Sequence, residues 1–354
     1  MKLTVPFIPD KKYIHFLKEQ TSSIESIYFP LYSGAVLDAR MRFKKTPLHE
    51  LSKGLQQIES VKKYCLLNSR FIHPMLYHDA LFLNQLLDTL EFLFAASQIN
   101  GIVFSDAYFL TAMTAEKREI IRCLEAVPGI NCMIDSSEKA FSFFDLVEQT
   151  GFKLPEKLVL DRSLNRNIPQ LEKTGTEIKQ RYGPVKIELI ANEGCIYHCP
   201  FKLTHDAQIA FSNTGCSPDK TFQINQSIGC HSYFFKRPET FFKSPFIRPE
   251  DLDEYTGVAD TIKLCGRTLG ANFLSNCINA YSKKSYRGNL LDLMDAACWL
   301  ADTYHIENKR LDPGFFNMLT NCTKVCKNCK TCKDLFLKAA QKKPFKIKLY
   351  EDCL

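Results

Sequence analysis

The sequence predicts an α/β fold, a TIM-like (β/α)8 barrel with a long cysteine-bearing loop after its seventh strand and a cysteine- and lysine-rich C-terminal tail. Eight short apolar or β-branched runs recur along the chain, separated by segments long enough to hold helices. Several runs are almost continuously hydrophobic, as parallel strands buried on both faces are. Eight strand–helix units within about 270 residues meet the requirement of a barrel. An open doubly wound sheet is the alternative, and the count of eight favours the barrel.

The expected strands follow one another at intervals that leave room for helices. They cover residues 3–8, 26–32, 64–68, 101–105, 131–134, 157–160, 186–190 and 261–264. Helix starts are marked by Asp79, by Thr114, and by Ser137 with Glu138. Such side chains accept hydrogen bonds from free backbone N–H groups or interact favourably with the helix dipole. The segment 289–304, which holds the only tryptophan, is expected to be an amphipathic helix.

The chain divides into two parts by composition. The barrel is expected to span residues 1–310, including the cysteine loop at 191–246, and a C-terminal extension spans 311–354. Long loops in compact domains are usually functional, and in a barrel a loop that follows a strand emerges at the face where active sites lie. No apolar run reaches the roughly 18 residues that a membrane helix needs, and no signal peptide is visible. We therefore expect a cytoplasmic protein without a membrane span.

The positive charge of the chain is concentrated in its tail. The formal net charge is +7, and the segment 322–348 holds nine lysines against one acidic residue, Asp334. The rest of the chain is close to neutral, so a charge argument for binding RNA or a protein partner applies to the tail alone. A solvated lysine-rich face is the alternative.

Four cysteines lie in the loop that follows the seventh expected strand. Cys195 and Cys199 are separated by three residues, and Cys216 and Cys230 follow singly. Zinc sites usually show paired knuckles, and only the first pair resembles one. Four thiolates from one loop suit a 4Fe–4S cluster at least as well. The spacing leaves a 4Fe–4S cluster, a zinc ion and free or structural thiols as alternatives.

The tail holds a second group of four cysteines, Cys322, Cys326, Cys329 and Cys332. The first three have the spacing of the radical-SAM signature, but that signature normally follows the first strand of a barrel, and these cysteines follow the last. A second iron–sulfur cluster or a zinc site is favoured, and a flexible reduced tail is the alternative. The interleaved lysines lower thiol pKa values and offset the charge of bound thiolates, whichever metal is present.

Polar side chains at the ends of expected strands converge at one mouth of a barrel. The candidate catalytic residues are Arg70, Asp135, Asp161, Arg162, Glu193, His205 and Arg267. The three arginines among them suit bidentate binding of carboxylates, as a small organic acid would need. His205 is a candidate acid–base group, with a structural histidine as the alternative. For the whole set, the alternative is a ring of structural salt bridges.

From about residue 157 to residue 267, the chain resembles the collagenase-like "unclassified" peptidase family. The resemblance rests on a strand followed by Asn192-Glu193-Gly194-Cys195-x3-Cys199-Pro200-Phe201, and then by His205 and the later cysteines. It implies a barrel-like fold with a four-cysteine 4Fe–4S cluster at one end. The matching ligands are Cys195, Cys199, Cys216 and Cys230, with Cys265 and Cys277 as substitutes for the last two.

The same resemblance implies oxygen-independent hydroxylation of ubiquinone precursors or of RNA bases, with prephenate as the oxygen source. The chain departs from the family pattern in two ways. It lacks the long Gly- and Ser-rich signature of the collagenase-like branch, and it lacks a carboxyl-terminal domain like that of the RNA-modifying members. The resemblance therefore gives a class of chemistry without a substrate.

Three functions are consistent with these observations. The first is an iron–sulfur enzyme that hydroxylates, or otherwise modifies by redox chemistry, an organic or RNA substrate. The second is a peptidase, as the family label states, although the sequence has no G-x-S-x-G elbow and offers no obvious nucleophile. The third is a non-catalytic iron–sulfur or zinc protein that binds RNA or a protein partner through its basic tail.

Overall fold

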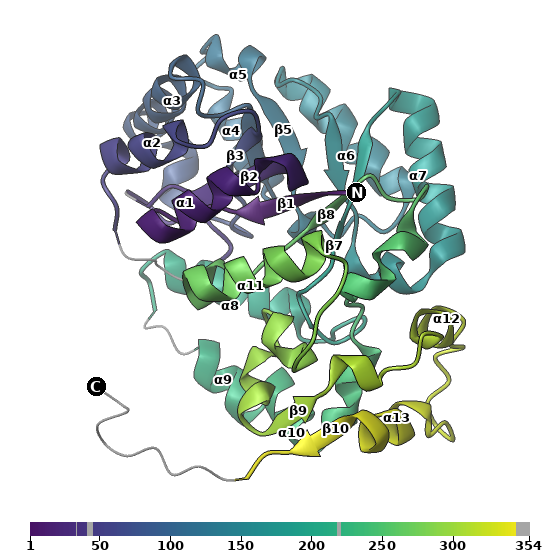
Figure 1. Cartoon of the computed structure of the whole chain (residues 1–354). Coiled ribbons are helices and arrows are strands. Elements are labelled where there is room, and N and C mark those ends of the chain that lie inside the picture. Colours follow the sequence, from purple (N-terminus) through teal and green to yellow (C-terminus); the bar gives the residue numbers. More distant parts are fainter. Residues whose placement is uncertain (33, 41–44, 218–220, 345–354) are drawn as a thin grey trace, which may run out of the picture.

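The computed structural model describes residues 1–32, 34–40, 45–217 and 221–344 of the chain. Eight parallel strands form one sheet in the order β5-β4-β3-β2-β1-β8-β7-β6. Their bounds are β1 Lys2–Pro6, β2 Ile24–Pro30, β3 Lys62–Leu67, β4 Gly101–Phe104, β5 Glu125–Pro128, β6 Lys157–Val159, β7 Lys186–Ile190 and β8 Thr261–Lys263. This order runs consecutively around a ring, whereas a doubly wound sheet reverses at a switch point. The predicted (β/α)8 barrel is confirmed (Figure 1).

The ring is nearly closed between β5 and β6, where the strand ladder is interrupted. Before β6, the N–H of Ala126 donates to the carbonyl of Lys153 at 3.1 Å. After β6, the N–H of Asp161 donates to the carbonyl of Ile134 at 2.7 Å. These backbone bonds join the two edges of the sheet at both ends of the gap.

Helices surround the strands, and the main hydrophobic core lies between the two layers. Alternation along the strands separates the core from the barrel interior: Ile27 and Phe29 belong to the main core, and Tyr28 belongs to a smaller interior cluster. The helices are α1 Lys11–Glu19, α2 Leu48–Gln56, α3 Ala80–Ala95, α4 Ala107–Met113, α5 Ile120–Cys123, α6 Ser137–Thr150, α7 Ile168–Tyr182, α8 Lys202–Asn213, α9 Thr221–Ser227, α10 Cys230–Lys236, α11 Gly270–Ser282, α12 Phe315–Thr320 and α13 Thr331–Ala339.

The barrel interior holds a buried cluster of charges. Glu188 on β7 accepts from Lys157 Nζ at 3.2 Å, and Lys263 Nζ lies 3.7 Å from its other oxygen. Hydroxyl groups from neighbouring strands complete the cluster, since Thr261 donates to Glu188 at 3.2 Å and Lys157 donates to Ser26 at 2.8 Å. Burial lowers the pKa of Lys263 to about 8, despite the attraction of Glu188. The interior is therefore polar below the mouth of the barrel.

The structure corrects the fifth expected strand. Residues 131–134 are not a strand, because Ile130–Cys132 forms a 3-10 helix and Met133 is left-handed at φ 54°. The strand is Glu125–Pro128, which pairs with β4. Gly101 on β4 allows this pairing, since a Cβ there would come within 2.3 Å of the Glu125 carbonyl oxygen.

Two of the four helix expectations are confirmed. Asp79 caps α3 by accepting from the N–H of Phe82 at 3.0 Å, and α6 begins at Ser137. Thr114 does not begin a helix, because it is the C-cap of α4, whose start is capped by Asp106.

The segment 289–304 is also not the expected helix. It contains the 3-10 helices Leu290–Leu293 and Cys298–Asp302, with irregular backbone between them. That backbone is engaged elsewhere: the N–H of Asp295 donates to the carbonyl of Asn192 at 2.8 Å. Hydrogen bonding to the loop after β7 therefore replaces the i→i−4 bonds that a helix would need.

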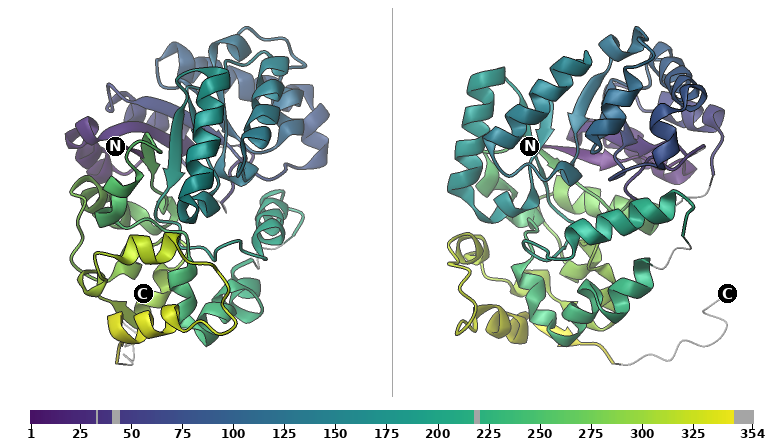
Figure 2. Two further views of the ribbon diagram at one scale, coloured as in Figure 1. Left: turned by 90° about the vertical axis from the view of Figure 1, so that its right-hand side faces the viewer. Right: turned by 180° about the vertical axis from the view of Figure 1, so that it is seen from behind.

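The segment after β7 and the tail form a second layer beneath the barrel (Figures 1 and 2). Within its described residues, the segment 191–246 contains the α-helices α8 to α10, although its sequence lacks regular periodicity. In the tail, β10 (Ala340–Lys342) pairs antiparallel with β9 (Tyr304–Ile306). Among the described residues, no helix has the length and apolar character needed to cross a bilayer.

The expected division at residue 310 stays a prediction. Residues on both sides of it share one hydrophobic cluster, which joins Phe315 and Leu335 of the tail to Phe242 and Phe246. The β9–β10 pair also links the two sides by backbone hydrogen bonds. The tail therefore packs against the rest of the molecule through α12, α13 and β10.

Candidate metal centre

The cysteine loop is fixed where it leaves β7. Asn192 is fully buried and bonds to both neighbouring segments. Its Nδ2 donates to the carbonyl oxygens of Cys265 at 3.1 Å and Leu293 at 3.0 Å, and its Oδ1 accepts from the N–H of Cys265 at 2.7 Å. This one amide holds together the segments that follow β7 and β8 and the start of the irregular segment near residue 293.

Gly194 gives the loop its sharp turn. Its φ is 75°, and a Cβ there would lie 3.1 Å from the Cβ of Ala297. Glycine adopts this left-handed conformation without steric strain. The next residue, Cys195, is thereby placed beside Arg162 and Glu193, whose charges both act on its thiol.

Among the loop cysteines, Cys199 lies close enough to Cys195 and to Cys230 for its charge to act on both thiols. Burial raises the pKa of Cys195 and of Cys199, and it raises the pKa of Cys230 to about 11. A charge on Cys199 would raise the pKa of both Cys195 and Cys230 further. These thiols are therefore neutral at pH 7 unless a cation binds to them, and they are soft donors of the kind that iron–sulfur clusters and zinc use.

Cys216 lies apart from the other three. Helix α8 begins after Cys199 and spans 12 residues before Cys216, a length of about 18 Å at the helical rise per residue. Cys216 is exposed, and its backbone N–H donates to Thr214 Oγ1 at 3.3 Å. Its role as a ligand stays a prediction that requires movement of the segment after α8.

Buried ion pairs surround the thiols at the mouth of the barrel. Arg162 pairs with Glu193, and both side chains are more than 90% buried. Burial lowers the pKa of Arg162, but the charges of Glu193 and Cys195 outweigh burial and raise it. Lys202, at the start of α8, pairs with Asp206 and also donates to Asn131 Oδ1 at 3.1 Å. Arg162 and Lys202 both lower the pKa of Cys195 and would stabilise its thiolate.

Arg70 and Arg267 lie around the same mouth but are already engaged. Arg70 donates to the carbonyl of Asn131 at 2.9 Å. Arg267 pairs with the buried Asp38. The Arg267–Asp38 contact is a structural salt bridge, which was the alternative to a substrate clamp, whereas Arg70 bonds to a backbone carbonyl. Arg162 is the candidate arginine whose charge lowers the pKa of both Cys195 and Cys199. Its Nη2 has no hydrogen-bond partner among the described residues.

The three remaining candidates have separate roles. Asp161 caps the 3-10 helix Arg162–Arg166 by accepting from the N–H of Ser163 at 2.9 Å. His205 Nε2 lies 3.0 Å from Asn225 Nδ2, and burial lowers the pKa of this histidine. Asp135 is half exposed and pairs with Lys139 at 2.7 Å. The charges of Arg162 and Glu193 thus act on the Cys195 thiol, and His205 lies within reach of the charges of Lys202, Asp206 and Glu193.

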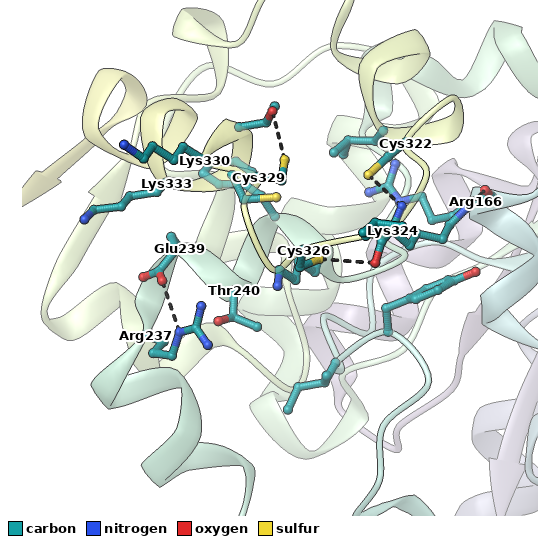
Figure 3. Close-up of a pocket in the computed structure, with 18 of the residues that line it drawn as sticks. Arg166, Arg237, Glu239, Thr240, Cys322, Lys324, Cys326, Cys329, Lys330 and Lys333 are labelled. Carbon is teal, nitrogen blue, oxygen red and sulfur yellow. Dashed lines mark hydrogen bonds and ion pairs between the residues drawn. The ribbon is translucent and has the colours of Figure 1, made fainter.

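The four tail cysteines line one cavity, on which Figure 3 shows Cys322, Cys326 and Cys329. Burial raises the pKa of Cys332 to about 11, and charges on Cys322, Cys326 and Cys329 would raise it further. Within residues 1–32, 34–40, 45–217 and 221–344, no three His, Cys, Asp or Glu side chains already stand in position around one metal ion. Both cysteine groups supply thiols, which are the donors that zinc and iron–sulfur sites use. To bind a metal, the thiols of each group would have to move closer together.

Several site residues were not identified from the sequence. They are Asp38, Arg40, Asp295, Lys202 and Asp206. The last two had a readable signal, since they lie four residues apart directly after the cysteine motif, a spacing that pairs side chains on a helix. Arg40 Nη2 bonds to Asp295 Oδ2 at 3.1 Å across 255 residues of sequence, and no local pattern reports such a pair.

Comparisons with known proteins identify the family of this chain. No family model matches the chain. An uncharacterized protease of Methanocaldococcus jannaschii is 30% identical over 247 residues, which are 69% of this chain and 68% of the relative. Among solved structures, a U32 peptidase aligns with a TM-score of 0.43 and 14% identity over 74% of this chain and 92% of that chain. An Anoxybacillus alpha-amylase aligns with a TM-score of 0.35 and 9% identity over 81% of this chain and 80% of that chain.

The Methanocaldococcus relative shares sequence with this chain over about two thirds of both proteins. This confirms the resemblance that the cysteine motif and the order of strands indicated. The chain belongs to the collagenase-like peptidase family.

Proposed function

We propose that this chain is an iron–sulfur enzyme that carries out oxygen-independent hydroxylation, or a related redox modification, of an organic or RNA substrate. The observation that carries the proposal is the grouping of Cys195, Cys199 and Cys230 beside the Arg162–Glu193 pair at the end of β7. A 4Fe–4S cluster bound there would supply single-electron chemistry. The chain's own residues would hold the cluster, compensate its charge and position the substrate.

The state of the thiols supports ligation over nucleophilic catalysis. A cysteine nucleophile reacts as its thiolate, so nucleophilic sites lower the thiol pKa. Burial instead raises the pKa of Cys195, Cys199 and Cys230. A bound metal stabilises the thiolates that burial disfavours. Arg162 and Lys202 supply further positive charge at the same place.

Arg162 also supports an organic acid as a ligand. It is buried at the mouth, and its Nη2 is unbonded within the part of the chain that the structure describes. A carboxylate oxygen of the ligand would satisfy this donor, as arginine–carboxylate pairs commonly do. Burial lowers the pKa of His205, which favours the neutral imidazole, and this ring would accept a proton beside Lys202 and Asp206.

The proposal is tested by the metal content of a loop variant. Cys195→Ser with Cys199→Ser, purified without oxygen, should lose the iron and acid-labile sulfide attributed to the loop cluster, together with redox activity. The matched control is Cys123→Ser, a partly buried cysteine on α5 that lies outside both cysteine groups. Wild-type protein that lacks sulfide altogether would overturn the proposal.

Peptide hydrolysis is the second candidate, because the Methanocaldococcus relative is described as a protease. It requires peptidase activity that survives replacement of the loop cysteines. If the doubly substituted loop variant cleaves peptides at the wild-type rate, hydrolysis replaces redox chemistry as the function. Binding of RNA or of a protein partner by the basic tail stays a prediction, and loss of RNA retention on removing the tail would test it.

A further inference from the structure

The tail and the cysteine loop enclose a cavity of about 710 Å³. One side is formed by the four tail cysteines, Cys322, Cys326, Cys329 and Cys332. The loop after β7 lines the same cavity with Ile196, Tyr197, Pro200 and Phe201. The residues between and after Cys195 and Cys199 thus border the cavity on which Figure 3 shows Cys322, Cys326 and Cys329.

The tail is anchored at both ends of its cysteine segment. Before the segment, Phe315 of α12 stacks on Phe246 with ring centroids 5.9 Å apart. After it, Phe336 of α13 packs edge-on against Phe242 at 6.3 Å and Tyr304 at 5.2 Å. These aromatic contacts are typical of core packing. The cysteine segment is therefore held over the cavity by its neighbours and does not itself supply the anchor.

The backbone turns at Lys324, which lies between the tail cysteines Cys322 and Cys326. The N–H of Lys324 donates to Cys322 Sγ at 3.4 Å, and Cys326 Sγ donates to the carbonyl of Lys324 at 3.5 Å. Lys324 has a left-handed φ of 61°. The tight turn places Cys322 and Cys326 on the same cavity, and N–H bonds to sulfur are among the contacts that tune metal–thiolate centres.

The cavity is lined by positive charge without matching carboxylates. Arg166 is 4% exposed, bonds through Nη2 to the carbonyl of Ser244 at 2.8 Å, and forms no ion pair among the described residues. Lys243, Lys324, Lys330 and Lys333 line the same cavity. The acid that lines it, Glu239, lies 3.4 Å from Arg237. The Arg166 guanidinium also lies over the rings of Phe246 and Phe315, 5.2 and 6.0 Å from their centroids, but no carboxylate among the described residues forms an ion pair with it. This lining is therefore suited to a group of negative charge.

We propose that Cys322, Cys326, Cys329 and Cys332 hold a metal centre of their own, distinct from the loop cysteines. Zn²⁺ and a 4Fe–4S cluster are both held by four thiolates, and either complex carries net negative charge. Arg166 and the lysines would offset that charge. The compact spacing of three, two and two intervening residues lets one short segment supply all four ligands.

The centre would border the same cavity as the loop that bears Cys195 and Cys199. This inference stands independently of the proposed redox function, because a structural zinc ion would meet the same observations. It gives the cysteines of the tail a role that the family resemblance does not supply.

The test uses full-length protein purified without oxygen. The variant Cys326→Ser with Cys329→Ser should lose one zinc ion, or the iron and sulfide of one cluster, and elemental and sulfide analysis distinguishes the two. The loop variant Cys195→Ser with Cys199→Ser should keep that metal. The control variant Cys123→Ser should keep the full metal and sulfide content of the wild type. Unchanged metal content in the tail variant would overturn the proposal of a tail centre. If only the loop variant loses metal, the result supports the proposed function at the loop and contradicts a centre in the tail.

A second measurement does not depend on a variant. Cys326 and Cys329 are exposed, so in metal-free protein they should be alkylated rapidly by iodoacetamide. In protein as purified, mass spectrometry should show both thiols protected, with protection lost after chelation. Equal alkylation before and after chelation would overturn the proposal.

Discussion

Cys195 of the loop and Cys329 of the tail lie in opposite electrostatic surroundings. Cys195 is packed against the buried Arg162–Glu193 pair, and burial raises its pKa. Cys329 is exposed, and hydrogen bonds with Thr331 lower its pKa. The same type of side chain thus meets a rigid, ion-paired environment in one place and a solvated, lysine-rich one in the other.

This difference indicates how each group would compensate the charge of bound thiolates. At the loop, fixed partners do so, and each partner is part of the packed barrel mouth. At the tail, lysine side chains and water can do so. Substitutions should therefore be costly around Cys195 and mild around the exposed tail cysteines, Cys326 and Cys329.

The largest effect on stability is expected for Glu193→Gln. The substitution leaves Arg162 buried without its carboxylate, and breaking one side of a buried pair costs about 3–5 kcal/mol. Urea denaturation of the variant and the wild type measures the difference. The control is Asp135→Asn, which removes a half-exposed pair with Lys139 and should cost less than about 1 kcal/mol. Equal losses in the two variants would contradict the contrast between buried and exposed charge.

A pH effect is expected from the charge cluster beneath the loop. The pKa of Lys263 is lowered from 10.5 to about 8 in the folded protein, so the unfolded chain binds more protons between these values. Stability contributed by this residue should therefore rise with pH from about 8 to about 10.5, by up to about 3 kcal/mol. Comparing the denaturation of wild type and Lys263→Met across this range isolates the effect. A stability difference that is flat in this range would rule out the lowered pKa.

A smaller effect is expected at the turn that places Cys195. Gly194→Ala forces a residue with a Cβ into φ 75° and against Ala297, at about 1–2 kcal/mol for the backbone conformation alone. Gly215→Ala is a matched control, since Gly215 has φ 79° and a Cβ added there would meet no described atom within 4 Å. The Gly194 variant should be less stable than the Gly215 variant and bind less iron. If the two variants have equal stability and equal iron content, the close contact with Ala297 does not contribute to the effect of Gly194→Ala.

The smallest effect is expected in the tail. Cys326→Ser changes an exposed side chain, and such substitutions usually alter stability by no more than about 0.5 kcal/mol. Thermal unfolding of the metal-free variant and the metal-free wild type measures this difference in stability. A loss as large as that of Glu193→Gln would show that the tail thiols are not solvated.

Local sequence patterns predicted most of the fold because most strands here are continuous apolar runs. The run at 186–190 matches β7 at both ends. The fifth strand was misplaced because two short apolar runs lie close together, and only pairing with Gly101 of β4 selects Glu125–Pro128. The segment 289–304 has helical periodicity, but its backbone bonds to Asn192 and Glu193, which are about a hundred residues away in sequence.

The candidate site was predictable only in part. The Cys195–Cys199 spacing and the polar ends of strands are local signals, and they located the mouth of the barrel. The ion pairs Arg267–Asp38 and Arg40–Asp295 join residues more than two hundred positions apart. Such pairs depend on closure of the barrel, so they became visible only in the folded structure.

The central claim, that the loop thiols hold an iron–sulfur cluster, is tested most directly by electron paramagnetic resonance. The sample is the tail variant Cys326→Ser with Cys329→Ser, purified without oxygen and reduced with dithionite. We predict the signal of one reduced 4Fe–4S cluster, which disappears when Cys195→Ser and Cys199→Ser are added. A signal that survives these two additions, or the absence of any signal from the tail variant and the wild type, would contradict the account.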